Sequence, residues 1–242
     1  MQAQLWGQPV QASVSSKAQK THLQFSGQQP VSAIRQWLEA KWLDAASGVI
    51  SYQADMELPG ANADVELNVD ADLVDVALAL PEPLARKAGT PMRGTTQLLA
   101  RAGVKDLSSD VGKLVNGKLR LRDGLVERGQ FVLNGSGARM PAESGVWVTG
   151  AVPNLTVNTW VDYFSAKKGD ELGDAPFPLK KVSLQVEHLD LFDLDIASAL
   201  VHVVPEPSRW RYVIDSDQLA AQALVPDGYD TRASVPMTIT VQ

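Results

Sequence analysis

Residues 62–89 contain two runs in which apolar and polar side chains alternate at every second position. The apolar positions are Val65, Leu67 and Val69 in the first run, and Val74, Val76, Leu78 and Leu80 in the second. A period of two places one set of side chains on each face of a β-sheet. The stretch therefore predicts strands with one apolar and one solvated face. Pro81 and Pro83 end them, because proline cannot donate to a strand ladder.

The same alternation recurs between turn signals along most of the chain, without the strand–helix rhythm of a parallel α/β protein. Further strands are predicted around residues 10–14, 23–25, 48–58, 118–133, 145–155, 180–204, 208–216 and 235–241. The Asp123–Gly124 pair predicts a hairpin turn, and residues 90–104 fit a strand or a helix. We therefore expect a mainly β chain with a long antiparallel sheet, although alternation alone would equally suit a closed sandwich.

Two segments switch to a helical period. In residues 30–48 the apolar side chains recur three, four and seven positions apart, with Pro30 suited to the first turn and Gly48 to the stop. Residues 158–166 predict a second short helix, capped by Asn158 or Thr159. The first helix is amphipathic and is expected to pack against the sheet by its apolar stripe.

The whole chain, 1–242, is expected to be one segment of a longer protein, because it starts and ends in strand-like sequence. Met1 is interpreted as supplied by expression. Residues 167–175 have linker composition and would divide the segment into 1–166 and 176–242. No apolar run approaches the roughly 20 residues of a membrane span, and the first residues lack a signal-peptide pattern.

Composition excludes several classes of function. The net charge of −6 and the isoelectric point near 5.1 argue against nucleic-acid binding, which needs a basic surface. The chain has no cysteine, so thiolate nucleophiles and cysteine-based metal sites are excluded. No glycine-rich loop leads into a helix as a phosphate site requires. We therefore expect no cofactor.

Catalytic and metal sites are also not indicated. None of the three histidines, His22, His188 and His202, stands near a nucleophile elbow. The acidic group Asp190, Asp193 and Asp195 alternates with leucines, which is typical of a solvated strand face rather than a calcium loop. The six tryptophans are scattered, which favours packing over a sugar-stacking platform. We therefore predict no catalytic residue, no metal ligand and no enzyme.

Five stretches support a family resemblance. In chain order they are LPEPLARKAG, GKLRLRDGLVERGQFVLNG, MPAESGVWVTGAVPNLTVNTW, LDLFDLDIASALV and RWRYVIDSDQLAAQALVPDG. The first is similar to a Leu-Pro-x-Pro-Leu followed by Lys-x-Gly, and the ordered set resembles the central region of the YhdP family. These are AsmA-like envelope proteins related to TamB.

The resemblance implies a segment of a bridge-like lipid carrier that spans the periplasm of a Gram-negative bacterium from an inner-membrane anchor. In such carriers a long antiparallel, curved sheet is thought to form an open groove, apolar inside and polar outside. The groove would shield phospholipid acyl chains between the inner and outer membranes, by passive conduction. Envelope proteins at either membrane are expected partners.

The residues expected to line this groove share the apolar face of predicted strands. They are Val65, Leu67, Val69, Val76, Leu78, Leu80, Leu119, Leu121, Phe131, Leu133, Val146, Val148, Leu184 and Val186. The same side chains would otherwise form an ordinary dry core. Two other functions remain open at this point: a structural or interaction domain that scaffolds envelope assembly without binding lipid, and a carbohydrate-active enzyme with a carboxylate pair in a cleft.

Overall fold

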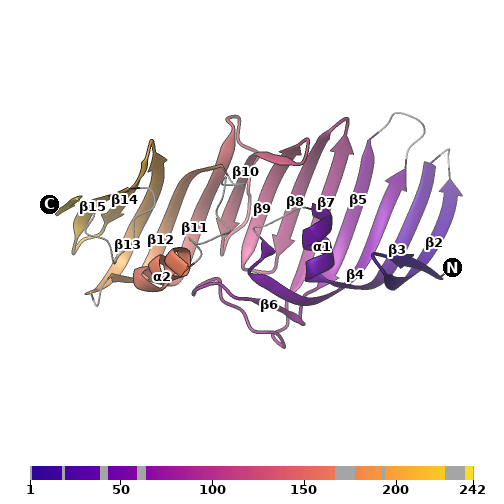
Figure 1. The fold of residues 1–242 in the computed structure, drawn as a ribbon, viewed down its shortest axis with the longest axis horizontal. Helices are drawn as coiled ribbons and strands as arrows, with labels where there is room; N and C mark the ends of the chain where they lie inside the picture. The colour runs from indigo at the N-terminus through magenta and orange to yellow at the C-terminus, as the bar shows by residue number, and fades with distance from the viewer. Residues whose placement is uncertain are drawn as a thin grey trace.

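One large sheet runs the length of the molecule (Figure 1). The computed structural model describes residues 2–17, 20–38, 43–58, 64–166, 178–191, 194–226 and 238–241. Within these residues fifteen strands follow one another in the sheet, from β1 to β16, while β6 pairs beside β4. The sheet does not close on itself. The prediction of a mainly β chain with a long open sheet and two short helices is confirmed.

The strands and helices take up most of the described chain. The first half contains β1 (Gln2–Leu5), β2 (Gln8–Lys17), β3 (Lys20–Pro30), α1 (Val31–Leu38), β4 (Ala46–Leu58), β5 (Val65–Asp72), β6 (Val76–Leu78), β7 (Arg93–Arg101) and β8 (Val104–Val111). The second half contains β9 (Val115–Arg122), β10 (Leu125–Leu133), β11 (Gly145–Thr156), α2 (Val157–Ala166), β12 (Leu179–Leu191), β13 (Leu194–Glu206), β14 (Arg209–Asp215), β15 (Ala220–Pro226) and β16 (Thr238–Val241). The segment that the sequence left open between strand and helix contains β7.

Most neighbouring strands are joined as antiparallel hairpins, so the order of the strands in the sheet follows their order in the chain. The turn between β9 and β10 illustrates why. Asp123 and Gly124 have φ angles of 51° and 82°, and positive φ at both central residues is the backbone of a type I′ turn. The predicted hairpin is confirmed, with Leu119 opposite Gly129.

Two strand pairs depart from the antiparallel expectation. β11 runs parallel to β10 on one side and to β12 on the other. A parallel pair needs a crossover connection instead of a tight turn. Residues 134–144 supply the first connection, and α2 lies in the second. The expectation of an antiparallel sheet is therefore wrong at these two pairs, and β11–α2–β12 is a strand–helix–strand unit.

The first helix is shorter than its apolar spacing predicted. α1 ends at Leu38, and β4 has already begun at Ala46. Gly48 does not stop a helix but lies inside β4, with a φ of 108°. The apolar spacing that predicted a longer helix includes Ala45, but Ala45 comes just before β4. Its carbonyl accepts a hydrogen bond from the amide of Ala79, which follows β6. Trp42 lies outside the described residues.

The second alternating run, from Val74 to Leu80, is only partly a strand. β6 covers Val76–Leu78 and pairs with the first residues of β4, while Val74 and Leu80 lie outside any strand. β5 pairs with the rest of β4 along the same edge. β6 is therefore a continuation of β5 along β4, after a break at residues 73–75.

The second helix begins at Val157, one position before the predicted cap. The hydroxyl of Thr159 donates to the carbonyl of Thr156 in its first turn, at 2.8 Å. The predicted linker at 167–175 lies outside the described residues, and β11 and β12 pair across that boundary. In the part of the chain that is described, neither helix has the length and hydrophobicity to cross a bilayer.

Candidate functional site

A single register row crosses the sheet from β2 to β15 on one face. Residues opposite each other in a strand pair point to the same face. Following the register from strand to strand gives Ala12, Phe25, Ala54, Val69, Thr96, Ser109, Gly117, Phe131, Val148, Val182, Val203, Tyr212 and Ala223. No member of this row is charged. This row is therefore uncharged and made of apolar or small side chains along its length, and we call the face that carries it the apolar face.

The adjacent row points to the opposite face and has the opposite character. From β2 to β10 it contains Ser13, Gln24, Asp55, Asn68, Gln97, Ser108, Lys118 and Gln130. Every side chain in this row is polar or charged. The sheet is therefore two-sided over at least these strands, and we call this second side the polar face.

The apolar face brings together all of the predicted lining residues except Leu80. Those in the main sheet are Val65, Leu67, Val69, Leu119, Leu121, Phe131, Leu133, Val146, Val148, Leu184 and Val186. Val76 and Leu78 join them from β6, opposite Gly48 and Ala46. Leu80 lies beyond the end of β6, in the loop that leads to β7.

The break at 73–75 explains how both alternating runs reach one face. Odd-numbered residues carry the apolar set in β5, and even-numbered residues carry it in β6. Three residues of this break oppose only two of β4, residues 49 and 50. The extra residue compensates for the change from odd to even positions, because a shift of one residue exchanges the faces.

Several apolar-face residues were not among the sequence candidates. They include Leu23, Phe25, Leu98, Leu107, Val152, Val182, Val201 and Val203. In three of these cases the contrast between the two faces is weak in the sequence, because Leu98, Val201 and Val203 stand beside Leu99, Leu200 and Val204. The stretch that was ambiguous between strand and helix contributes Leu98.

Burial divides the apolar face into two parts. Along β10–β13 it is a closed core in which Val152, Val186 and Leu189 are 1%, 2% and 0% exposed. On β5 the residues Val65 and Leu67 are only half-buried. Toward the N-terminus individual positions are buried, among them Val10 and Ala54, but Val14 is 56% exposed. The apolar face is thus more open in its N-terminal part.

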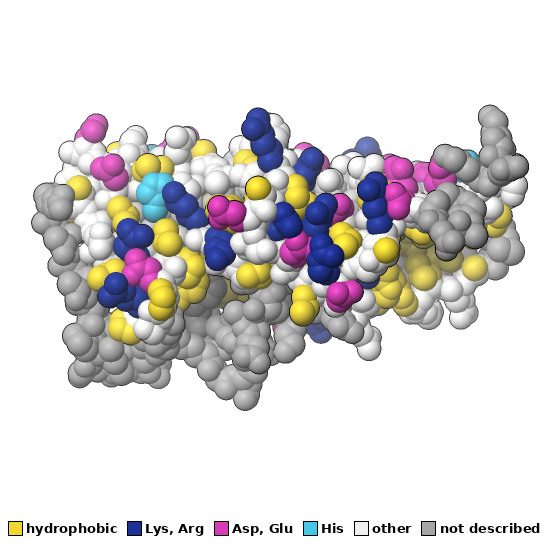
Figure 2. Space-filling view, turned by 90° about the horizontal axis from the view of Figure 1, so that it is seen from above, with side chains coloured by type: hydrophobic (Ala, Val, Ile, Leu, Met, Phe, Trp, Pro, Cys, Tyr) yellow, Lys and Arg dark blue, Asp and Glu magenta, His cyan; other side chains and the backbone are white. Residues whose placement is uncertain are grey.

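Helix α1 packs over part of this open region. It contacts β3 and β4, and its first residue, Val31, is 3% exposed. Its Trp37 ring lies 5.4 Å from the ring of Trp6, in the β1–β2 turn, and 5.7 Å from the ammonium group of Lys105 on β8. Figure 2 shows hydrophobic side chains in a recess toward the N-terminal end, with Lys, Arg, Asp and Glu side chains spread over the neighbouring surface.

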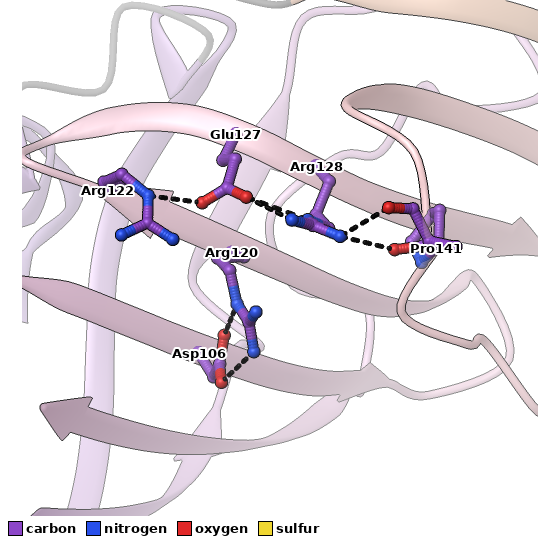
Figure 3. A network of polar contacts seen from close by, with 7 residues as sticks. Asp106, Arg120, Arg122, Glu127, Arg128 and Pro141 are labelled. Atoms are coloured by element: carbon purple, nitrogen blue, oxygen red, sulfur yellow. Dashed lines mark hydrogen bonds and ion pairs between the residues drawn. The ribbon is translucent and has the colours of Figure 1, made fainter.

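Ion pairs crosslink the polar face over β8–β10 (Figure 3). Arg120 binds Asp106 on the next strand through two hydrogen bonds. Glu127 accepts from Arg122 at 2.8 Å and also from Arg128. Arg128 donates in turn to the carbonyls of residues 141 and 142, which ties the β10–β11 connection to the polar face.

These contacts lower the pKa of the carboxyl groups involved. The hydrogen bond from Arg120 lowers the pKa of Asp106, and burial opposes this effect only in part. The hydrogen bonds from Arg128 and then Arg122 lower the pKa of Glu127. Each carboxylate is therefore stabilised in its charged form.

Among the residues described, no three His, Asp or Glu side chains are grouped so as to hold a metal ion. His188 lies 3.9 Å from Asp195, with 62% and 80% of the two side chains exposed, and Asp193 is outside the described residues. Trp6 pairs with Trp37, while Trp160 pairs with Tyr163. The most extended organised feature of the described chain is the apolar face.

A family model described as YhdP protein matches residues 1–240. Neither a curated protein nor a solved structure matches the chain.

Proposed function

The chain belongs to the YhdP family, an AsmA-like family of the cell envelope, and we propose that its apolar face carries the acyl chains of phospholipids across the periplasm. The observation that supports this role most is the continuous uncharged row of apolar and small side chains from β2 to β15. Strands lie about 4.8 Å apart, so a row of this kind extends over roughly 60 Å. An ordinary core does not need one uninterrupted face of that length.

The energetic need for such a face is large. Each methylene moved out of water contributes about 0.8 kcal/mol, so a sixteen-carbon acyl chain costs about 12 kcal/mol to expose. The half-buried residues of β5 offer an apolar contact surface, while the polar row behind them faces water. Acyl chains would lie against the apolar face, and headgroups would remain solvated.

No chemical step is needed for this role. The side chains lower the barrier to lipid movement by burying apolar surface, and the direction of movement is set elsewhere in the longer protein. We place the segment in the periplasm, as part of a protein anchored in the inner membrane. Envelope proteins at either membrane are the partners that such a bridge requires.

A matched pair of photo-crosslinkers tests the proposal. A diazirine amino acid placed at Leu67 lies on the apolar face, and the same group at Asn68 lies on the polar face of the same strand. Purified protein is mixed with vesicles of phosphatidylethanolamine and phosphatidylglycerol, irradiated and analysed by mass spectrometry. We expect lipid adducts at position 67 and few or none at 68.

Equal capture at both positions, or capture at neither, would contradict the proposal. Protein adducts without lipid adducts in cells would instead favour a scaffold that assembles envelope proteins.

A further inference from the structure

The loop between β6 and β7, residues 79–92, reaches a distant part of the apolar face. Its base is fixed beside β5, where the amide of Gly89 donates to Val74 and that of Leu73 to Met92, at 2.7 and 2.9 Å. Its Leu84, however, packs against the buried cluster of β10–β13. The strands β7, β8 and β9 lie between these two places in the sheet. The loop therefore extends along the apolar face, across several strands.

The loop is a shaped structure. Leu78 and Arg86 exchange backbone hydrogen bonds at 2.8 and 3.1 Å. The guanidinium of Arg86 donates to the carbonyls of Val76 and Thr90, which joins the two sides of the loop. These contacts hold its base, while its far end, residues 81–84, extends beyond them.

Helix α2 meets this far end over the same cluster. Val157, the first residue of α2, packs against the cluster, as Leu84 does. The indole nitrogen of Trp160 donates to the carbonyl of Glu82 at 3.0 Å, between residues 78 positions apart in the chain. We call residues 79–92 and α2 together the cover.

We propose that the cover occupies an acyl-chain site over β10–β13, and that the site opens when the hydrogen bond between Trp160 and Glu82 is released. This inference rests on the proposed function. The sheet beneath the cover continues the same apolar row as the open part, from Val148 to Val182 and Val203. The two parts thus offer an acyl chain the same kind of surface, and they differ in what lies on it.

The contacts that hold the cover are suited to reversible opening. Trp160 contributes a neutral hydrogen bond to Glu82, and Leu84 and Val157 add apolar packing that an acyl chain can replace in kind. The base of the loop has its own hydrogen bonds and can stay in place while the far end moves. A lipid would therefore pass from the open part of the face to the covered part by displacing residues 81–84 and α2.

Removing the hydrogen bond is the first test. Trp160→Phe deletes the indole N–H and keeps an aromatic ring. A diazirine amino acid at Val148 reports lipid in the covered part, and one at Leu67 reports lipid in the open part. With phosphatidylethanolamine and phosphatidylglycerol vesicles, we expect lipid capture at 148 to rise roughly five-fold in Trp160→Phe. The loss of one hydrogen bond shifts the equilibrium between the closed and the open cover by about this factor. Capture at 67 should not change.

Closing the cover covalently is the second test. Because the chain has no cysteine, Glu82→Cys with Tyr163→Cys gives two unique thiols that a cleavable bis-maleimide can join. Crosslinked protein should lose lipid capture at 148 and retain it at 67, and cleavage of the linker should restore it. Each single-cysteine variant, treated with the same reagent, is the matched control.

The two positions separate failure of this inference from failure of the proposed function. If position 67 captures no lipid in any form of the protein, the proposed function is wrong. If 67 captures lipid and 148 captures none even in Trp160→Phe, the covered part is a permanent core and the inference is overturned. Equal capture at 148 in crosslinked and cleaved protein overturns it as well.

Discussion

Arg120 on β9 holds Asp106 on β8 through two hydrogen bonds, 2.6 Å from Nε and 2.7 Å from a terminal guanidinium nitrogen. The two residues are directly opposite in the register, so the planar guanidinium meets the carboxylate edge to edge across the polar face. Both side chains remain about 30% exposed, and solvent therefore weakens the pair. The pair stabilises the junction of two strands whose other face is the candidate lipid surface.

Asp106→Asn is expected to lower the free energy of unfolding by about 1 kcal/mol at pH 7. This value is that of a bidentate ion pair, reduced because both side chains are partly exposed to solvent. The pKa of Asp106 is lowered by Arg120, so this stability is present above the usual value of 3.8 and is lost as pH falls through the lower folded-state value. Urea unfolding at pH 7 and in acid measures it. Asp110→Asn, which has a neutral partner in Asn116, is the control. A deficit that persists unchanged in strong acid would contradict the assignment.

Matched valines distinguish the covered from the open part of the apolar face. Val186 is 2% exposed, whereas Val69 is half-buried. Val186→Ala should cost about 2 kcal/mol in the free energy of unfolding, because it removes buried methyl groups and leaves a cavity. Val69→Ala should cost less than half of that. Urea denaturation of the two variants is the measurement, and equal losses would show that both positions lie in one closed core.

Gly150 is expected to be intolerant of any side chain. Its φ is 134°, and a Cβ there would lie 2.1 Å from the carbonyl oxygen of Leu133 on the neighbouring parallel strand. Gly137 also has a positive φ, of 83°, but has open space around it. Both alanine variants carry backbone strain, so Gly150→Ala should lose roughly 1–3 kcal/mol more than Gly137→Ala. Thermal unfolding followed by circular dichroism compares them, and similar midpoints would refute the close approach of β10 and β11.

His202 should make the fold sensitive to mild acid. Burial and then the charge of Lys181 lower its pKa below the usual 6.5. The unfolded chain therefore binds a proton before the folded chain does, and stability falls as pH drops through 6.5 toward the folded-state value. His202→Gln should flatten the decline between about pH 7 and pH 5, and Lys181→Gln should flatten it in part. The measurement is the urea midpoint across this pH range. If His202 had no role, the midpoint would fall with pH at the same rate in the unmodified protein and in His202→Gln.

Much of the apolar face could be predicted from the sequence, because a period of two has a direct geometric meaning. Val65, Leu67 and Val69 reveal their common face without knowledge of any partner strand. The Asp123–Gly124 turn could be predicted for a similar reason, since its backbone preference is local. In both cases neighbouring residues determine the structure.

The parallel direction of β11 could not be predicted from neighbouring residues, and neither could the contact that forms the cover. Alternation in β11 has the same appearance whether its neighbours run parallel or antiparallel. The contact of Trp160 with Glu82 joins segments far apart in the chain, and no local pattern encodes it. The break at 73–75 was visible only as an interruption, because its effect on the faces depends on the register with β4.

The two parallel junctions beside β11 have a consequence for how the chain folds. From β1 to β10, and again from β12 to β16, almost every strand can join a sheet that its chain neighbour has already started, so folding can propagate by short loop closures. β11 cannot form such a hairpin on either side, and both of its ladders require longer closures. We therefore expect its amides to gain protection from hydrogen exchange late in refolding. Two cooperative units would form first, and β11 would join them last.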